Sequence, residues 1–282
     1  MQTHHSARMQ IDDFTRIYNH RAIATTMLLY LVLPLCSPAA IAEAQRGDPV
    51  LVNLVAFEYQ NVDEFMDALG DLETALLERG DRRATFTAIY SVLTKRAMED
   101  LEEGQFEDSE WAAALTVAFG NLYREAFYNY ETGNLAELPW AWRVAFDVAA
   151  VEGATVFQHA LLGVSAHVNH DLPYAIATVT PSSERGLRYS DYVVTNELVV
   201  GAILEVERLL GEIAPPLAEL DNALGDLDAA LLCIVLTRWR FRAWSNAQLF
   251  DGRLPLFYES FMSWWHDIQT GHMARVIAIG TD

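Results

Sequence analysis

Apolar side chains recur every three or four residues along most of this chain, and that spacing limits what it can fold into. The first such stripe is formed by Val62, Phe65, Met66, Leu69, Leu72 and Leu76. These positions share one face of an α-helix, because the helix repeats about every 3.6 residues. Asn61 precedes the stripe and Gly80 follows it, and these residue types commonly begin and end helices. A helix with one apolar face has to bury it, so we expect helices packed on helices.

The same pattern continues to the carboxyl end and predicts an all-α fold. Pro173 is expected to disturb the end of one predicted helix, because proline has no N–H to donate. The pattern allows one short strand, over Val50–Phe57. Connections between the segments are short, which predicts a single compact multi-helix bundle of about eight or nine helices. After the first, the expected helices begin at Asp81, Ser109 and Pro139 and then cover Thr155–Asp171, Ser190–Leu210, Pro216–Leu224, Asp226–Phe250 and Pro255–Ile279.

The composition supports a globular domain and excludes one class of partner. Of the 282 residues, 52% are hydrophobic, which is enough material for a substantial core. Acidic side chains number 39 against 19 basic ones, giving a formal net charge of −20. Nucleic acids bind to basic surfaces that displace their counterions, so no nucleic-acid partner is expected. A small-molecule ligand or substrate is the expected partner.

The amino-terminal residues 1–44 are typical of a secretory leader. Basic side chains precede a short apolar run, residues 28–36, and small side chains suited to signal cleavage follow it. The run is too short to cross a bilayer as a helix, which takes about 20 residues. We therefore expect an exported protein, periplasmic or extracellular, whose mature chain is one helical domain over 45–282 without a membrane span. An uncleaved amino-terminal anchor is the alternative.

One predicted helix, over Thr155–Asp171, carries ionisable side chains on an otherwise apolar surface. His159 lies two turns before the main cluster, and Gly163 leaves room for a helix, a water or a ligand to approach. A helix that is apolar on most sides is usually buried, so its ionisable groups need partners inside the bundle. The cluster stands at i, i+3 and i+4 on one helix face and consists of His167, His170 and Asp171.

This cluster has two interpretations. Imidazole nitrogens on one face, next to a carboxylate, suit zinc or another divalent metal, and bundles build such sites from facing helices. Asp171 would alternatively orient an imidazole for proton transfer. The structural alternative is a buried hydrogen-bond network that fixes the register of the bundle. For the metal hypothesis the expected ligands are His167, His170, Asp171 and Asp191, with Glu197 as a further candidate.

A second polar feature is the run Arg238-Trp-Arg-Phe-Arg-Ala-Trp244. Arg238 and Arg242 stand at i and i+4, so they share one helix face and concentrate positive charge in an acidic chain. They are candidates to hold an anionic group of a substrate, or to pair with acidic side chains of the cluster. His266, near the carboxyl end, is expected at the surface.

The segment Ala160–Pro173, ALLGVSAHVNHDLP, resembles the signature of the bacterial domain-of-unknown-function family DUF5995. Flanking stretches such as Pro139–Trp142 and Asp191–Glu197 also resemble family landmarks, so the resemblance covers roughly residues 60–250. Val164-Ser165 departs from the family's usual Met-Asn, and His170 stands at a variable position. The resemblance implies a helical fold and a polar set formed by His167, Asn169, Asp171, Asp191, Asn196 and Arg242.

The sequence thus leads to one functional hypothesis and one alternative. The hypothesis is a metal-dependent hydrolase, with His167, Asp171 and Arg242 as catalytic residues and a divalent metal, zinc above all, as cofactor. The alternative is a non-catalytic binding or interaction domain in which the same cluster is structural. The expected substrate pocket is lined by His159, Asn169, Asn196, Glu197 and Arg238.

Overall fold

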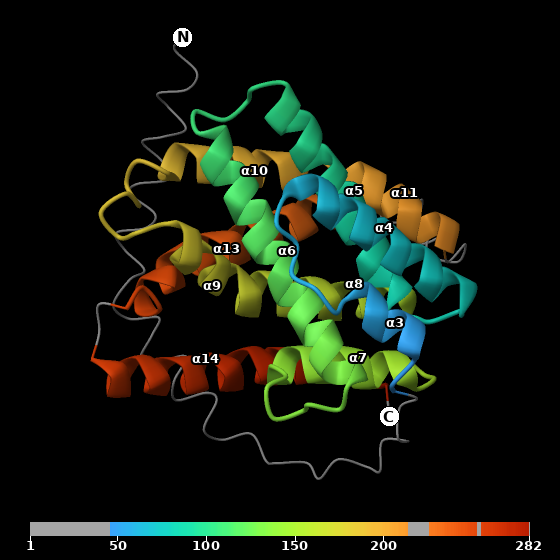
Figure 1. Cartoon of the computed structure of the whole chain (residues 1–282). Coiled ribbons are helices and arrows are strands. Elements are labelled where there is room, and N and C mark those ends of the chain that lie inside the picture. Colours follow the sequence, from blue (N-terminus) through green and yellow to red (C-terminus); the bar gives the residue numbers. More distant parts are fainter. Residues whose placement is uncertain (1–45, 214–225, 253–254, 282) are drawn as a thin grey trace. The chain divides into compact units, whose positions relative to one another are not determined.

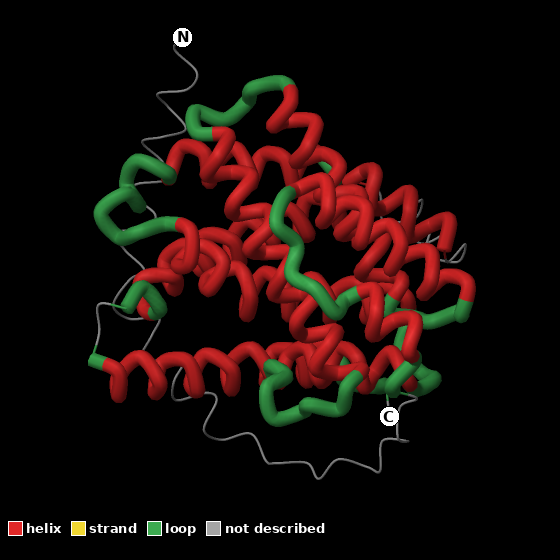
Figure 2. The backbone as a smooth tube through the Cα atoms, in the orientation of Figure 1, coloured by secondary structure: helices red, strands yellow, loops and turns green. Residues whose placement is uncertain are grey.

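Helices make up the regular structure of the chain (Figures 1 and 2). The computed structural model describes residues 46–213, 226–252 and 255–281, and in these ranges it contains helices, turns and loops but no strand. The expected all-α class is confirmed. In chain order the elements are α3 (Pro49–Leu54), α4 (Val62–Glu78), α5 (Ala84–Glu102), α6 (Ser109–Glu131), α7 (Trp140–Ala150), α8 (Val156–Ser165), the π-helix η1 (Ala166–Asp171), α9 (Leu172–Val179), α10 (Tyr189–Gly201), α11 (Ile203–Ile213), α13 (Asp226–Asn246), the short 3₁₀ turn η2 (Ala247–Leu249) and α14 (Leu256–Ile277).

The first predicted stripe forms α4 as expected. The Asn61 side chain accepts a hydrogen bond from the Glu64 N–H at 2.9 Å, which satisfies one free donor of the first turn. Phe65 and Leu72 are 0% and 1% exposed, because the stripe faces the core. The helix ends at Glu78, next to Gly80, whose positive φ of 62° suits glycine.

The consecutive elements α8, η1 and α9 run through the middle of the bundle. They contact α5, α6, α7, α13 and α14, so they are covered on several sides (Figure 1). Ala160, Leu162 and Leu172 of this run belong to three different apolar clusters of the core. The sequence prediction that this segment is buried is therefore confirmed.

Several predicted boundaries are wrong. Residues 49–54 form α3 and not part of a strand, because Pro49 suits the first turn of a helix and the Asp48 side chain accepts from the Val50 N–H at 2.8 Å. The helix expected over Ser190–Leu210 is two helices, α10 and α11, which meet at Ala202.

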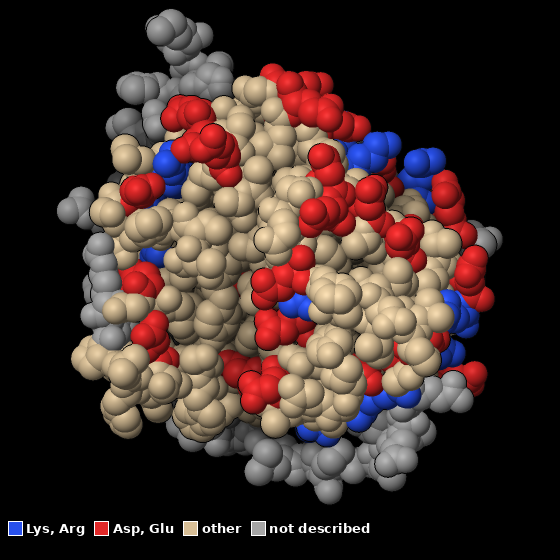
Figure 3. Space-filling model, viewed as in Figure 1, with Lys and Arg blue, Asp and Glu red and all other residues tan. Residues whose placement is uncertain are grey.

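Other predictions lie outside the described residues. These are the secretory leader and the helix over Pro216–Leu224. None of the described helices is long and apolar enough to cross a membrane. On the face shown in Figure 3, acidic side chains predominate over lysine and arginine, in keeping with the net charge of −20.

Candidate functional site

The predicted polar helix contains a π-turn at its centre. Across η1 the backbone N–H of Leu172 donates to the carbonyl of His167, five residues earlier, where an α-helix would span four. Pro173 lies one residue beyond and has no N–H for an α-helical bond to Asn169. The helical run therefore does not end near Asp171, as predicted, but widens there and continues as α9 to Val179.

Asp171 is the centre of the site and accepts three hydrogen bonds. Its Oδ2 is 2.9 Å from His167 Nδ1 and 2.8 Å from the indole nitrogen of Trp142. Its Oδ1 is 2.9 Å from Nδ1 of His170. Asp171 is only 2% exposed, and these donors satisfy a carboxylate that would otherwise be costly to bury.

The hydrogen bonds fix the tautomers of both imidazoles. An ionised carboxylate only accepts, so Nδ1 of His167 and Nδ1 of His170 each carry a proton. Burial raises the pKa of Asp171, but the hydrogen bonds from the two histidines outweigh it and hold that pKa below its ordinary value. Burial lowers the pKa of His167, against the opposing effect of Asp171. His167 is therefore neutral and presents a lone pair on Nε2.

Aromatic side chains hold the His167 ring in place. The Phe119 ring stacks on it with centroids 3.5 Å apart and planes 7° from parallel. Tyr90 meets its edge at 4.4 Å. With Nδ1 bonded to Asp171 and one face covered, the ring has a fixed direction. Its Nε2 is buried and has no hydrogen-bond partner among the described residues.

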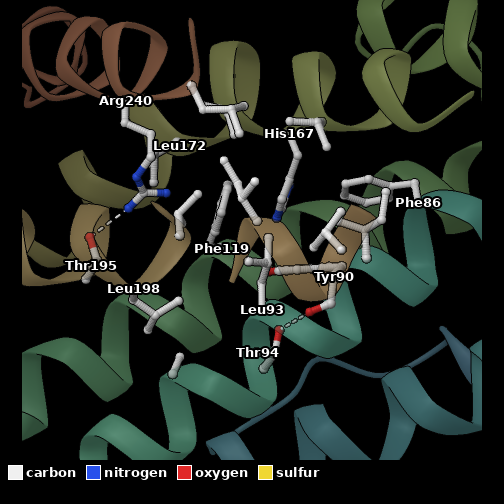
Figure 4. A pocket seen from close by; sticks show the side chains of 18 of the residues that line it. Phe86, Tyr90, Leu93, Thr94, Phe119, His167, Leu172, Thr195, Leu198 and Arg240 are labelled. Carbon is white, nitrogen blue, oxygen red and sulfur yellow. Dashed lines mark hydrogen bonds between the residues drawn. The ribbon is translucent and has the colours of Figure 1, made fainter. Parts of the chain in front are cut away.

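Nε2 faces a partly open cavity of about 150 Å³ (Figure 4). The lining comes from α5, α6, α8, η1, α9, α10, α11 and α13, and most of it is apolar, including Leu93, Leu115, Val164 and Ile203. In Figure 4, His167 reaches into this space from one side and Tyr90 from another. The Tyr90 hydroxyl is also buried without a hydrogen-bond partner in the described part of the chain. Burial raises the pKa of Tyr90 well above its ordinary value, so the hydroxyl keeps its proton.

Arg240, on α13, is the charged residue of the cavity lining. Its side chain is buried, with Nε 2.5 Å from Asn196 Oδ1 and Nη2 2.6 Å from Thr195 Oγ1. Arg240 was not among the site residues predicted from the sequence. Its neighbours Arg238 and Arg242 were predicted to hold an anionic group, but the structure places both on the exposed face of α13. The signal was present, because Arg240 lies on the buried stripe of Leu236, Ala243, Trp244 and Ala247.

The remaining candidates are distributed around the bundle. Asp191 accepts from the backbone N–H groups of Glu107 and Asp108, at 2.7 and 3.0 Å, and so fixes the entry to α6. Glu197 is exposed, whereas Asn196 is buried beside Arg240. None of these three side chains is among the cavity-lining residues.

The other polar residues of the central run have different surroundings. Asn169 Nδ2 is 3.3 Å from Ser165 Oγ and 3.4 Å from the sulfur of Met273. His159 is buried, lies outside the cavity lining, and finds no hydrogen-bond partner for either ring nitrogen among the described residues. His266 is 4% exposed, so the prediction of a surface position is wrong. It packs beside His170 and bonds its carbonyl at 3.2 Å.

The positions of the histidine and carboxylate side chains bear on the predicted metal site. Among the residues that the structure describes, no group of three or more His, Cys, Asp or Glu side chains could hold a metal ion. Each of the two histidines, His167 and His170, turns its Nδ1 towards Asp171. Nε2 of His170 lies 3.8 Å from Asp267 Oδ1, away from Nε2 of His167, which faces the cavity. Zinc binding stays a prediction.

Comparison with known proteins places the chain in a family. The model of a family of unknown function, DUF5995, matches residues 62–278, a range that contains every residue of the site described above. No curated protein and no solved structure shows a significant match. The match covers most of the chain and confirms the resemblance seen in the motif at 160–173. The chain therefore belongs to the DUF5995 family of unknown function.

Proposed function

We propose that this domain binds a small, mainly apolar molecule that carries a hydroxyl group, in the cavity beside His167. One observation carries the proposal: Nε2 of His167 and the hydroxyl of Tyr90 line the same apolar cavity, and neither has a hydrogen-bond partner among the described residues. Buried polar atoms are nearly always hydrogen-bonded, so two such atoms on one cavity call for a ligand.

The two atoms have complementary roles. Nε2 of neutral His167 can only accept a hydrogen bond, and the protonated Tyr90 hydroxyl can donate one. A ligand hydroxyl both donates and accepts, so a single hydroxyl satisfies both atoms. An apolar cavity of about 150 Å³ holds a molecule of roughly the size of benzene. The Asp171 carboxylate favours a proton on His167, which opposes but does not reverse the lowering of the His167 pKa by burial.

The test compares two probes of equal skeleton, toluene and benzyl alcohol, by ligand-observed NMR or calorimetry. We expect wild-type protein to bind benzyl alcohol roughly 5- to 100-fold more tightly than toluene, the value of two net neutral hydrogen bonds. His167→Asn keeps a donor for Asp171 in place of Nδ1 but has no atom at Nε2, so the preference should fall to the roughly 3- to 10-fold that the Tyr90 bond alone gives. Binding of neither probe, or an unchanged preference in His167→Asn, would refute the proposal.

A cavity-blocking variant locates the binding. Leu93→Trp places a large ring at the cavity lining, and the same change at Leu187, which is 71% exposed, is the matched control. Leu93→Trp should abolish binding of both probes, whereas Leu187→Trp should leave it unchanged. Equal binding by the two variants would place the probes elsewhere on the protein.

A metal-dependent hydrolase is a second candidate, supported by one feature of the site. Carboxylates commonly orient zinc-binding histidines through the second ring nitrogen, as Asp171 orients His167. Its weakness is that His167 is the one cavity-lining His, Cys, Asp or Glu in the described part of the chain. Zinc bound at one equivalent in tag-free protein and lost in His167→Asn would favour this candidate over simple ligand binding.

A further inference from the structure

Arg240 carries a buried positive charge for which the described residues supply no negative partner. Two of the five N–H donors of a guanidinium are used by Asn196 and Thr195, both of which are neutral. No Asp or Glu of the described chain forms an ion pair with it. Its guanidinium also lies 5.4 Å from the centroid of the Tyr192 ring, which is a weak attraction.

Another buried arginine shows what the fold does when it balances such a charge internally. Arg83 pairs with Asp81 and with Glu131, both at 2.6 Å. Burial opposes the charge of Arg83, but the two carboxylates outweigh it and raise the pKa of Arg83 above its ordinary value. Burial lowers the pKa of Arg240, and no carboxylate counteracts it. Arginine nevertheless keeps its proton in proteins, so the cost of burying this charge remains.

Arg240 lies on the wall of the same cavity as His167, and Figure 4 shows its guanidinium at that wall with Thr195 on one side. An isolated buried cation is stabilised most by an anion placed in the same low-dielectric space. A carboxylate matches the planar donor pattern of a guanidinium and brings one negative charge to balance one positive charge. The rest of the cavity is mainly apolar, which suits a hydrocarbon or aromatic body.

We infer that the small apolar ligand of this cavity carries a carboxylate in addition to its hydroxyl group, with Arg240 as its anion-binding residue. The inference rests on the proposed function, because it uses the same cavity, and it adds the chemical class of the ligand. The acidic surface of the chain disfavours adventitious binding of anions elsewhere, since the net charge is −20. Carboxylate binding by this protein should therefore depend on the buried arginine.

The test uses phenylacetate and its neutral isostere phenylacetamide, which share a skeleton and differ in charge. Wild-type protein should bind phenylacetate at least about tenfold more tightly, the value of one charge-assisted hydrogen bond, and phenylacetate should raise its Tm more than phenylacetamide does at equal concentration. In Arg240→Met the preference should be lost while phenylacetamide still binds. Arg238→Met, an exposed position two residues away on α13, should behave as wild type.

The outcomes separate the two proposals. If wild-type protein binds phenylacetamide but does not prefer phenylacetate, the anion-binding role of Arg240 is overturned and the apolar cavity stands. A preference that survives in Arg240→Met overturns it as well. If neither of these compounds nor benzyl alcohol binds, the proposed function fails. The Tm comparison needs wild-type protein alone, so the inference stays testable even if Arg240→Met does not fold.

Discussion

Replacing Asp171 by asparagine tests whether one buried carboxylate organises the site. The substitution keeps the size of the side chain but removes its charge and one of its two acceptor oxygens. The amide is best placed with its oxygen at the Oδ2 position, where it still accepts from Trp142 and His167. Its NH₂ group then faces His170 Nδ1, which has to move its proton to Nε2, towards Asp267.

The expected loss follows from the three bonds. Hydrogen bonds to a charged group are worth about 1.5–3 kcal/mol and neutral ones about 0.5–1.5 kcal/mol, so each of the three loses about 1 kcal/mol. A neutral amide is easier to bury than a carboxylate, which offsets part of this loss. We therefore expect Asp171→Asn to lower the free energy of unfolding by roughly 2–3 kcal/mol.

The assay is urea unfolding followed by circular dichroism at neutral pH. The pKa of Asp171 lies below its ordinary value, so its contribution is fully present above about pH 4 and is lost as the pH falls through the folded-state pKa. Asp267→Asn is the control, because Asp267 is 39% exposed and accepts from the Trp140 N–H at the start of α7, where asparagine caps equally well. It should cost less than about 1 kcal/mol. Equal stabilities of the two variants would refute the role given to Asp171.

Three further substitutions test the surroundings of the site. His266→Gln should make the stability less dependent on pH, because burial lowers the pKa of His266 to about 3. Between pH 8 and pH 5 the unfolded chain gains a proton on His266 that the folded chain does not, so the wild type alone should lose about 2 kcal/mol of unfolding free energy from this group. Parallel curves of stability against pH for the two proteins would contradict this. The added methyl group of Gly163→Ala would overlap the Phe86 ring and should destabilise the protein by about 1–2 kcal/mol in thermal unfolding. Gly70→Ala, with open space around it, should stabilise the protein by up to about 1 kcal/mol. The opposite order would show that the helices separate without cost. Tyr90→Phe should leave the stability of the ligand-free protein unchanged or slightly higher. Tyr123→Phe removes a 2.8 Å hydrogen bond to Thr87 and should lower the free energy of unfolding by about 1 kcal/mol. Equal losses would mean that the Tyr90 hydroxyl is hydrogen-bonded in the folded protein.

Much of the fold could be predicted from spacing because most helices here bury a single stripe. The stripe of α4 and its cap at Asn61 are clear in the sequence, and the structure has both. The region before it was misjudged, since the six residues of α3 are too few for a helical period to be distinguished from a strand. The break at Ala202 was missed as well, although Gly201 directly before it is a residue type that commonly ends helices.

The site was only partly predictable, for a different reason. The i, i+4 relation of His167 and Asp171 is local, so spacing alone brings them together, and the structure joins them at 2.9 Å. Trp142, Tyr90 and Arg240 meet them through packing between helices, which no spacing along one helix reveals. The π-turn adds to this, because a turn one residue wider changes which side chains face each other in a way that an α-helical projection cannot give.

Asp171 and Arg240 show two ways of carrying a charge into the same apolar interior. The fold satisfies Asp171 completely with donors of its own chain, so its charge stabilises the protein whether or not a ligand is present. Arg240 is bonded only to neutral acceptors, so in the ligand-free protein no negative charge offsets the free-energy cost of burying its positive charge. A molecule that binds the folded state alone stabilises it in proportion to its affinity, and an anion at Arg240 would supply what the chain lacks. The two residues should therefore respond differently to phenylacetate: loss of Asp171 should lower stability with and without it, whereas loss of Arg240 should remove the stabilisation that phenylacetate brings.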